Sequence, residues 1–515
     1  MTKKIIFFFF VFVFSTNSLA SNLIDQNFCF KDSKENYNYN IELIEVKIDK
    51  YKNWTENGIK IIIGNFRWTP AKYKKRFKAK IIVTYTNKKK CIFDARVRHN
   101  GNQKDHIRLI DNSNSIIQSL DVNLISGNIY GIKKFKLLLD NTRGVLEDEI
   151  FLTSLLRKLN YLAPRSMYLN VNLNGSFLKM LFQENATNEM LKYNKRKIGP
   201  IFRGDERFFF KLAEKLPDNN ESNESLGMIP LLEDTLRAML IKQHNSEIIF
   251  ENENFLKISK NSYSNLSLIY LFYTNIFKDK KNDFRYFDYT LNNELLAFYQ
   301  DERTLELDIY NLILNSTNSL HSLSINNRKF YWNNKENYFE PINYDNNVNF
   351  SKEPNLIIFP LTKSTDKAFL HLDNLLKNID IEALNKEINS YGIKQNIKTS
   401  KDKLNLIKKN LSTIKNIYIN IDKDLLTYNY NKKVDKKMWN SFFKALNKIN
   451  KNIRVVRNTK KEFQVCDLAL NCKKRKFSTQ DIEKLLNGDM IIDNIEYQYI
   501  GNEFEDNELV KNYVE

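Results

Sequence analysis

Two polar residues in the second half of the chain have the types and positions expected of metal ligands. Asn327 precedes the aromatic run Phe330–Trp332, and Asp345 follows the apolar run Phe339–Ile342. Carboxylate and amide oxygens at strand ends are hard ligands of the kind that Mg²⁺ prefers. We therefore predict that Asn327 and Asp345 bind a metal and take part in catalysis, with Asn326 as an adjacent alternative.

His321 is the candidate general base, because an imidazole with an ordinary pKa near ~6.5 can exchange protons at neutral pH. It stands five residues before Asn326, and the window 315–325 contains no aspartate. Two structural alternatives remain open. Trp332–Tyr338 also fits a plain β-hairpin, with two strands around a polar turn, and His321 also fits a purely structural role.

The first twenty residues have the three-part layout of a secretory signal peptide. Lys3 and Lys4 precede an apolar run, and the segment ends in small residues at Ala20. We expect cleavage after Ala20 and an exported, soluble protein, periplasmic or extracellular. No transmembrane anchor is expected after cleavage, since the apolar run covers about ten residues against the ~20 that span a bilayer.

Four cysteines remain after the expected cleavage, namely Cys29, Cys91, Cys466 and Cys472. An even number of cysteines in an exported chain predicts two disulfides. The short loop between Cys466 and Cys472 favours that bridge, which leaves Cys29 with Cys91. The two other pairings stay open at this point.

The chain is basic, which makes anionic partners reasonable. Its formal net charge of +19 becomes +17 when Lys3 and Lys4 leave with the signal peptide (19 − 2 = 17). A nucleotide, an anionic envelope polymer or an exported protein fits this charge, whereas nucleic acid is not expected as the partner of an exported chain. The alternative reading is a solvated basic surface in a compositionally skewed sequence.

The order of strand and helix signals indicates an α+β protein. We expect strands at 41–48, 58–63, 78–85, 91–97, 167–173, 177–182, 330–332, 338–342 and 417–421, and helices at 146–160, 231–243, 305–314, 364–416 and 436–449. Asn174-Gly175 is the strongest hairpin signal. The expected domains are a signal peptide (1–20), a β-rich segment (21–95), a core (96–363) and a mainly helical C-terminal region with a small disulfide-bearing tail (364–515).

Several local motifs occur in an order that resembles the CotH family of secreted, kinase-like proteins. Their shared order carries the resemblance, which covers about Lys78 to Phe350. The motifs are Arg96-Val97-Arg98-His99-Asn100-Gly101-Asn102, similar to Arg-x-Arg-Gly-x-Ser; Gly131-Ile132-Lys133-Lys134-Phe135-Lys136-Leu137, similar to Gly-x-Lys-x-Phe-x-Leu; the helix and turn Leu155–Ser166 near Ala-Pro; and Val171-Asn172-Leu173-Asn174-Gly175 with Gln183-Glu184.

This resemblance implies a kinase-like core that transfers phosphate from ATP to a protein or glycan hydroxyl, with Mg²⁺ or Mn²⁺. Such a site needs a cation on the nucleotide phosphates, metal ligands and a base. Asn327 and Asp345 are the expected metal ligands, and His321 is the expected base. Arg98, Lys104 and Lys134 are the candidates for the phosphate-binding cation. Glu184 is expected at the adenine side of the nucleotide or paired with a basic residue, with a surface glutamate as the alternative.

The sequence also departs from the family pattern. Asn346-Asn347 follows Asp345 where a second carboxylate is expected, and Gln118–Val122 lacks the usual lysine. These departures favour an alternative function, in which a catalytically inactive kinase-like envelope or coat protein binds an anionic polymer or a partner protein. A hydrolase using His321 is a third reading, but none of the usual hydrolase motifs supports it.

Overall fold

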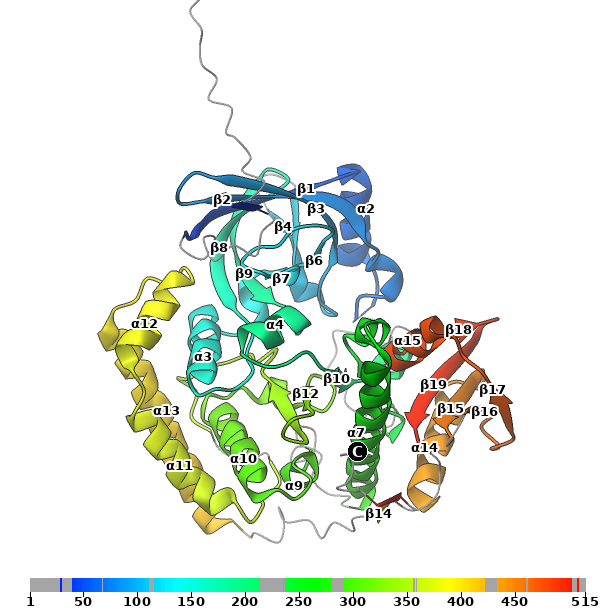
Figure 1. Ribbon diagram of the computed structural model, residues 1–515. Coiled ribbons are helices and arrows are strands. Elements are labelled where there is room, and N and C mark those ends of the chain that lie inside the picture. The colour runs from blue at the N-terminus through cyan, green and yellow to red at the C-terminus, as the bar shows by residue number, and fades with distance from the viewer. Residues whose placement is uncertain are drawn as a thin grey trace, which may run out of the picture.

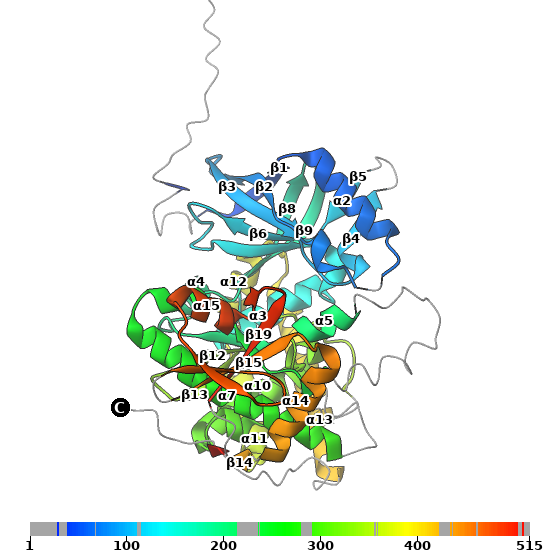
Figure 2. The same ribbon diagram turned by 90° about the vertical axis from the view of Figure 1, so that its right-hand side faces the viewer.

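The structure is a computed structural model that describes residues 28–29, 39–66, 68–110, 115–213, 235, 237–279, 291–354, 357, 359–421, 433–434, 436–459, 462–502 and 507–508. The fold is α+β, as the sequence predicts. A β-barrel forms one end of the molecule, and two further sheets and most of the long helices form the other end (Figure 1, Figure 2).

Seven strands close the barrel in the order β1-β2-β3-β6-β7-β9-β8. They are β1 (Ile41–Ile48), β2 (Phe77–Tyr85), β3 (Lys90–His99), β6 (Leu120–Leu124), β7 (Lys134–Leu138), β8 (Ser166–Leu173) and β9 (Ser176–Glu184). Alternate residues such as Phe93 and Val97 are buried in the barrel interior, as the two-residue period of a strand requires. The sequence did not predict a closed barrel, and the expected domain boundary at residue 95 lies inside β3.

One helix and a small β-ladder pack beside the barrel. The helix is α2 (Tyr51–Ile63), and it contacts β4 (Ile107–Ile110) and β5 (Ser115–Gln118). The predicted hairpin between β8 and β9 is confirmed, with Asn174 and Gly175 both at positive φ (47° and 100°). A two-residue turn that keeps the strands' twist needs this conformation, which asparagine and glycine adopt most readily.

The central sheet of the second part has four antiparallel strands in the order β11-β10-β12-β13. These are β10 (Ile201–Gly204), β11 (Ile241–Gln243), β12 (Lys329–Asn333) and β13 (Tyr338–Ile342). The predicted strand pair before Asp345 is therefore confirmed. The long helix α7 (Glu253–Asp279) packs between β11 and the C-terminal sheet (Figure 1), and one hydrophobic core joins all three.

The C-terminal sheet has the order β17-β16-β15-β19-β18 and carries two helices. Its strands are β15 (Ile453–Asn458), β16 (Phe463–Cys466), β17 (Cys472–Arg475), β18 (Ile491–Ile492) and β19 (Ile495–Gly501). The two helices are α14 (Lys436–Ile449) and α15 (Thr479–Asn487). A separate ladder pairs β14 (Lys433–Val434) with β20 (Asn507–Glu508). The expected disulfide-bearing tail is thus part of a sheet that shares its core with α7 and the central sheet.

A helical layer lies on the opposite side of the central sheet from the C-terminal sheet (Figure 1). It consists of α3 (Leu146–Lys158), α10 (Asp301–Ser316), α11 (Thr365–Lys377), α12 (Ile381–Ser390) and α13 (Ile397–Asn420), which share a second hydrophobic core. Three short α-helices are also present, namely α4 (Asn188–Tyr193), α5 (Arg207–Ala213) and α9 (Asn293–Leu296).

Three local predictions were wrong where they can be compared. Gly58–Ile63 is part of helix α2, not a strand, and Ile417–Ile421 continues α13 to residue 420. In both places the apolar residues form a buried face at helical spacing. In α13, for example, Ile414 and Tyr418 are four residues apart and both are buried. The helix expected at 231–243 ends in strand β11, and residues 231–234 and 236 lie outside the described residues.

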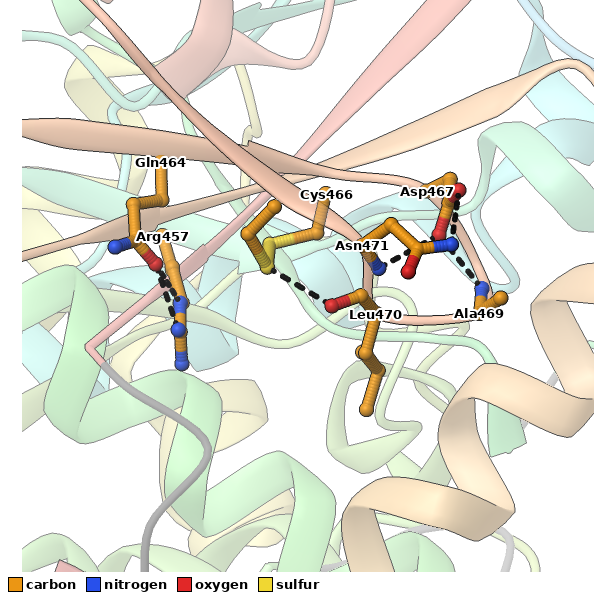
Figure 3. The surroundings of a disulfide bond; sticks show 8 residues. Arg457, Gln464, Cys466, Asp467, Ala469, Leu470 and Asn471 are labelled. Carbon is orange, nitrogen blue, oxygen red and sulfur yellow. Dashed lines mark hydrogen bonds between the residues drawn. A yellow bond between two sulfur atoms is a disulfide. The ribbon is translucent and has the colours of Figure 1, made fainter.

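Two disulfides are present, Cys29–Cys91 and Cys466–Cys472, which is the pairing that the loop length favours. The second joins the neighbouring strands β16 and β17. Asp467 closes the loop between them by accepting hydrogen bonds from the backbone N–H groups of Ala469 and Asn471 (Figure 3).

The two disulfides are expected to contribute unequally to stability. Cys29–Cys91 spans 62 residues and Cys466–Cys472 spans 6. Chain entropy then predicts that replacing both cysteines of the first pair by alanine lowers the free energy of unfolding by about 4 kcal/mol. The same replacement in the second pair should lower it by about 2 kcal/mol. Urea unfolding of the two double-alanine variants measures this difference. An equal loss in both variants would contradict the entropic account.

The expected signal peptide, residues 1–20, lies outside the described residues. Within the part of the chain that is described, no helix has both the length and the apolar character needed to cross a membrane.

Candidate functional site

The residues singled out for catalysis lie where the barrel meets the central sheet. After β13 the chain runs through Asp345 to Val348, and Val348 pairs with the segment that follows the barrel strand β7. Gly144 forms a parallel bridge with Val348, and the Val145 N–H donates to the Val348 carbonyl oxygen at 3.2 Å. Backbone contacts therefore hold the Asp345 turn against the barrel.

Asp345 occupies a tight turn and has a basic partner. Its φ of 60° is left-handed, a conformation in which aspartate is tolerated better than most residues. Its Oδ1 lies 2.8 Å from Arg143 Nη1, and its Oδ2 lies 3.8 Å from His321 Nε2. Burial alone would raise the pKa of Asp345, but the basic groups around it, Arg143 foremost, outweigh burial and lower it. Asp345 is therefore a carboxylate at neutral pH.

The structure brings the three predicted catalytic residues together. His321 lies in a short 3₁₀ turn (Leu320–Leu323), and its Nε2 is 2.8 Å from Asn327 Nδ2. An amide nitrogen can only donate, so His321 Nε2 accepts in this arrangement. His321 thus stands between Asn327 and Asp345, with half of its side chain exposed.

Four cations surround this turn, and we call them the cation cluster: Lys136, Arg143, Arg203 and Lys329. Lys136 Nζ contacts the hydroxyl of Tyr344 and lies 4.6 Å from the centre of its ring. Lys329 Nζ lies 2.8 Å from the same ring centre. The amines of two lysines, one from the barrel and one from the central sheet, therefore meet at a single tyrosine.

The cation cluster has unusual electrostatics. Burial lowers the pKa of Lys136 to about 7, with a further lowering by Arg143. Burial also lowers the pKa of Lys329 well below its ordinary value, and Lys136 and Arg203 add to this. Arg203 stands directly opposite Lys329 on β10, so both side chains lie on one face of the sheet. Arg143 Nε and Arg203 Nε are buried, and neither has a hydrogen-bond partner among the described residues.

A polar row on the barrel leads to this cluster. Arg98, Asp121, Lys136 and Gln183 stand directly opposite one another on β3, β6, β7 and β9. Directly opposite residues share a face, and this face is the outer one, because Phe135 and Leu137 fill the interior. The row therefore points away from the barrel core.

A pocket of about 210 Å³ lies beside this row, and we call it the barrel pocket. Two of the predicted phosphate-binding residues, Arg98 and Lys134, line it. Arg98 Nε is 2.7 Å from Asp121 Oδ2, and Lys134 Nζ is 3.3 Å from Glu247 Oε1. The other lining residues are Arg76, Asn123, Asn185, Ala186, Thr187, His244 and Asn245.

His244 connects the barrel pocket with the cation cluster. Burial lowers its pKa well below the ordinary value, and the charges of Lys329, Arg203, Lys134 and Lys136 lower it further. Asp121, which also lines the pocket, stands directly opposite Lys136 of the cation cluster. The barrel pocket therefore lies beside one member of the cluster.

Two predicted residues lie elsewhere. Lys104 Nζ donates to the Gly64 carbonyl oxygen at 2.8 Å and lies over the ring of Phe66, beside α2. Glu184 is fully buried, and its Oε1 is 2.6 Å from Arg165 Nη2. Glu184 therefore pairs with a basic residue, one of the two roles considered for it, inside the protein and not on a ligand-facing rim.

Glu149 is a carboxylate that the sequence analysis missed. It lies on α3, is fully buried, and its Oε1 accepts hydrogen bonds from Gln183 Nε2 and Asn346 Nδ2, both at 3.0 Å. Burial raises the pKa of Glu149 to about 7, although the charge of Arg143 opposes this shift. Glu149 thus links Gln183 of the polar row on the barrel to Asn346, the residue after Asp345, through hydrogen bonds.

The sequence held some signal for these missed residues. Lys136 alternates with the buried Phe135 and Leu137, which places it on the outer face of a strand. Lys329 lies inside the segment that was singled out for Asn327. Arg143 carried no signal, because its role depends on a contact with a residue about two hundred positions away.

The predicted metal ligands fit a divalent ion poorly. One oxygen of Asp345 faces the Arg143 guanidinium and the other faces His321, while the amide of Asn327 contacts His321. In the described part of the chain, no group of three or more His, Cys, Asp or Glu side chains could hold a metal. A metal ion at Asp345 would therefore have to displace Arg143 or His321 from the carboxylate oxygens.

Comparison of the sequence with models of known protein families and with curated proteins gives no match.

Proposed function

We propose that the protein is a kinase-like ligand-binding protein whose cation cluster binds the phosphate groups of a nucleotide such as ATP. The observation that supports this proposal is the convergence of buried basic side chains. Lys136, Lys329 and Arg143 converge on the turn that carries Asp345, and Arg203 stands beside Lys329. Buried cations are unfavourable unless an anion compensates them, and a polyphosphate supplies several negative charges at once.

The barrel pocket supports the choice of a nucleotide. It lies beside Lys136 of the cation cluster and is lined by the side-chain amides of Asn123 and Asn185. Amides both donate and accept hydrogen bonds, as the edge of a base or the hydroxyls of a sugar require. In this proposal the cation cluster binds the phosphates and the barrel pocket binds the rest of the nucleotide.

ATP is expected to raise the unfolding midpoint of the protein, whereas adenosine is not. A ligand that binds only the folded state stabilises it, by about 2.7 kcal/mol at one hundred times the dissociation constant. Thermal unfolding of the disulfide-bonded protein with ATP, inorganic triphosphate, adenosine or dextran sulfate measures this. A shift with ATP and triphosphate alone supports the proposal. A shift with dextran sulfate alone would favour the binding of an anionic polymer, and an equal shift with adenosine would contradict the phosphate site.

A second candidate function is phosphoryl transfer, and the convergence of His321, Asn327 and Asp345 favours it. In this reaction the bond between the γ-phosphorus and its bridging oxygen breaks, and a protein or glycan hydroxyl forms the new bond. ADP leaves, and His321 Nε2 takes the hydroxyl proton. In the described arrangement this nitrogen accepts a hydrogen bond, as a base must.

The test of phosphoryl transfer is incorporation of label from γ-labelled ATP into exported proteins or glycans. The His321→Gln variant should still bind ATP but transfer no label. The matched control is His371→Gln, because His371 is an exposed residue of α11. ATP binding without any label transfer by the wild-type protein would leave the catalytically inactive alternative, a binding protein of the cell envelope.

Export belongs to the same proposal, and the two disulfides support it because such bonds persist in oxidising compartments. The expected result is a mature protein that begins at Ser21 in the periplasmic or extracellular fraction. N-terminal sequencing of the purified protein decides this point.

A further inference from the structure

Arg143 occupies the place at Asp345 that a metal ion would need. Its Nη1 lies 2.8 Å from Asp345 Oδ1, and its side chain is 6% exposed against 17% for the aspartate. A divalent ion on this oxygen would have to displace a buried guanidinium. Removing one partner of a buried ion pair is strongly unfavourable, because the other charge stays buried without compensation.

The position of Arg143 is fixed by the backbone. It follows a short 3₁₀ turn (Asp140–Thr142) after β7, and its Nη1 also donates to the Thr142 carbonyl oxygen at 2.9 Å. The next residue, Gly144, has φ 65°, and a Cβ there would lie 2.6 Å from the Val348 carbonyl oxygen. The glycine thus lets the chain after Arg143 pass close to the chain after Asp345, and the two residues are held opposite each other.

The surrounding charges also oppose a divalent cation. Lys136 and Lys329 meet at Tyr344, the residue directly before Asp345. Like charges at these separations repel strongly in a buried site. A phosphate group is attracted to the same residues, because guanidinium and ammonium groups form charge-assisted hydrogen bonds with its oxygens. Arg143 Nε is buried and has no partner among the described residues, so it is a donor still to be satisfied.

We infer that the cation cluster binds the phosphate groups of its ligand without a divalent metal ion, through Arg143, Lys136 and Lys329. This inference rests on the proposed function and specifies it further. The protein's own cations neutralise the phosphates, which is the task of Mg²⁺ in kinases. Asp345 then serves to hold Arg143 in position and does not bind a metal.

The first test is the metal dependence of ATP binding, measured by titration calorimetry of the disulfide-bonded protein in EDTA, in Mg²⁺ and in Mn²⁺. The expected result is binding in EDTA that is at least as tight as in either metal. Binding that needs Mg²⁺ or Mn²⁺ would overturn the inference and leave the proposed function standing. The absence of ATP binding under all three conditions would overturn both.

The second test uses the isosteric variant Asp345→Asn. Asparagine keeps an oxygen that can accept a hydrogen bond from Arg143 Nη1, so Arg143 stays in position, while the negative charge that repels the phosphates is removed. The variant is therefore expected to bind ATP about tenfold more tightly, an effect of the order measured for close charge pairs. A metal ligand would behave in the opposite way, since replacing even the hydrogen-bond partner of a metal ligand costs about 10–100-fold. A weaker affinity in a variant with an unchanged unfolding midpoint would therefore overturn the inference.

Arg143→Gln provides the complementary variant, since it removes the charge and keeps a hydrogen-bonding side chain. It is expected to weaken ATP binding by about 10–100-fold, the effect of losing charge-assisted bonds. The matched control is Arg108→Gln, an exposed arginine on β4 whose partner Asp140 is exposed as well. Unchanged ATP affinity in a folded Arg143→Gln variant would contradict the inferred role.

Discussion

The double variant Lys136→Met/Lys329→Met is expected to lose the rise in unfolding midpoint that ATP gives the wild-type protein. Both ammonium groups lie against Tyr344 and face the same turn. A hydrogen bond to a charged group contributes about 1.5–3 kcal/mol, so each lysine accounts for roughly tenfold to hundredfold in affinity. Together their removal should lower the affinity for ATP by about 100-fold or more, as titration calorimetry can measure.

The pH dependence of ATP binding gives a second readout of Lys136. Its pKa is about 7 in the folded protein, so the free protein loses this charge as the pH rises above 7. Because the phosphates bind the protonated amine, affinity should fall by up to about tenfold per pH unit from pH 7 to 9. Lys329, Arg143, Arg203, Asp121 and Asp345 also act on this amine. The single variant Lys136→Met should flatten the profile.

In the absence of ligand, the free energy of unfolding should rise with pH, whereas the affinity for ATP should fall. Between pH 7 and 10.5 the amine of Lys136 is neutral in the folded protein and charged in the unfolded chain. The unfolded state then binds more protons, so stability rises with pH in this window. Lys136→Met removes this rise and the cost of burying the amine, and it should not destabilise the protein near neutral pH.

The matched control for these variants is Lys52→Met, which changes an exposed lysine of α2. It should leave both the affinity for ATP and the pH profile unchanged. If the double variant keeps the ATP-induced shift while Lys52→Met behaves as the wild type, the cation cluster is not the phosphate site.

Arg165→Met is expected to destabilise the protein by about 3–5 kcal/mol, the usual cost of leaving one member of a buried ion pair alone. Glu184 is fully buried, and it accepts hydrogen bonds from Arg165 Nε at 2.9 Å and Nη2 at 2.6 Å. The Arg165 guanidinium also lies 4.2 Å from the centre of the Tyr193 ring. Urea unfolding of the variant and the wild type measures the loss.

Two further variants test this explanation. Arg165→Met/Glu184→Gln removes the uncompensated charge and should recover part of the lost stability. The surface control is Lys88→Met, because Lys88 and Glu42 form an exposed pair, and such pairs contribute only about 0–1 kcal/mol. A loss at Arg165 as small as that at Lys88 would show that the buried pair contributes little.

Local patterns predicted many of the individual elements. The strand at 41–48 and the helix at 436–449 have the predicted bounds, and the Asn174-Gly175 hairpin and the strand pair before Asp345 are present. These predictions depend on periodicity and turn chemistry, which act over a few residues. The errors at 58–63 and 417–421 have the same origin, because a short run of isoleucines fits a strand and a buried helix face equally well.

The sequence by itself determined the residue types available for chemistry, the α+β class and the favoured cysteine pairing. Only the tertiary structure decided that seven strands close into a barrel, since closure depends on pairing between β1 and β8, more than a hundred residues apart. It also decided that Lys136 reaches Tyr344, 208 positions away, and that Arg143 pairs with Asp345. Charge pairing of this kind depends on burial and distance in space, which no local pattern encodes.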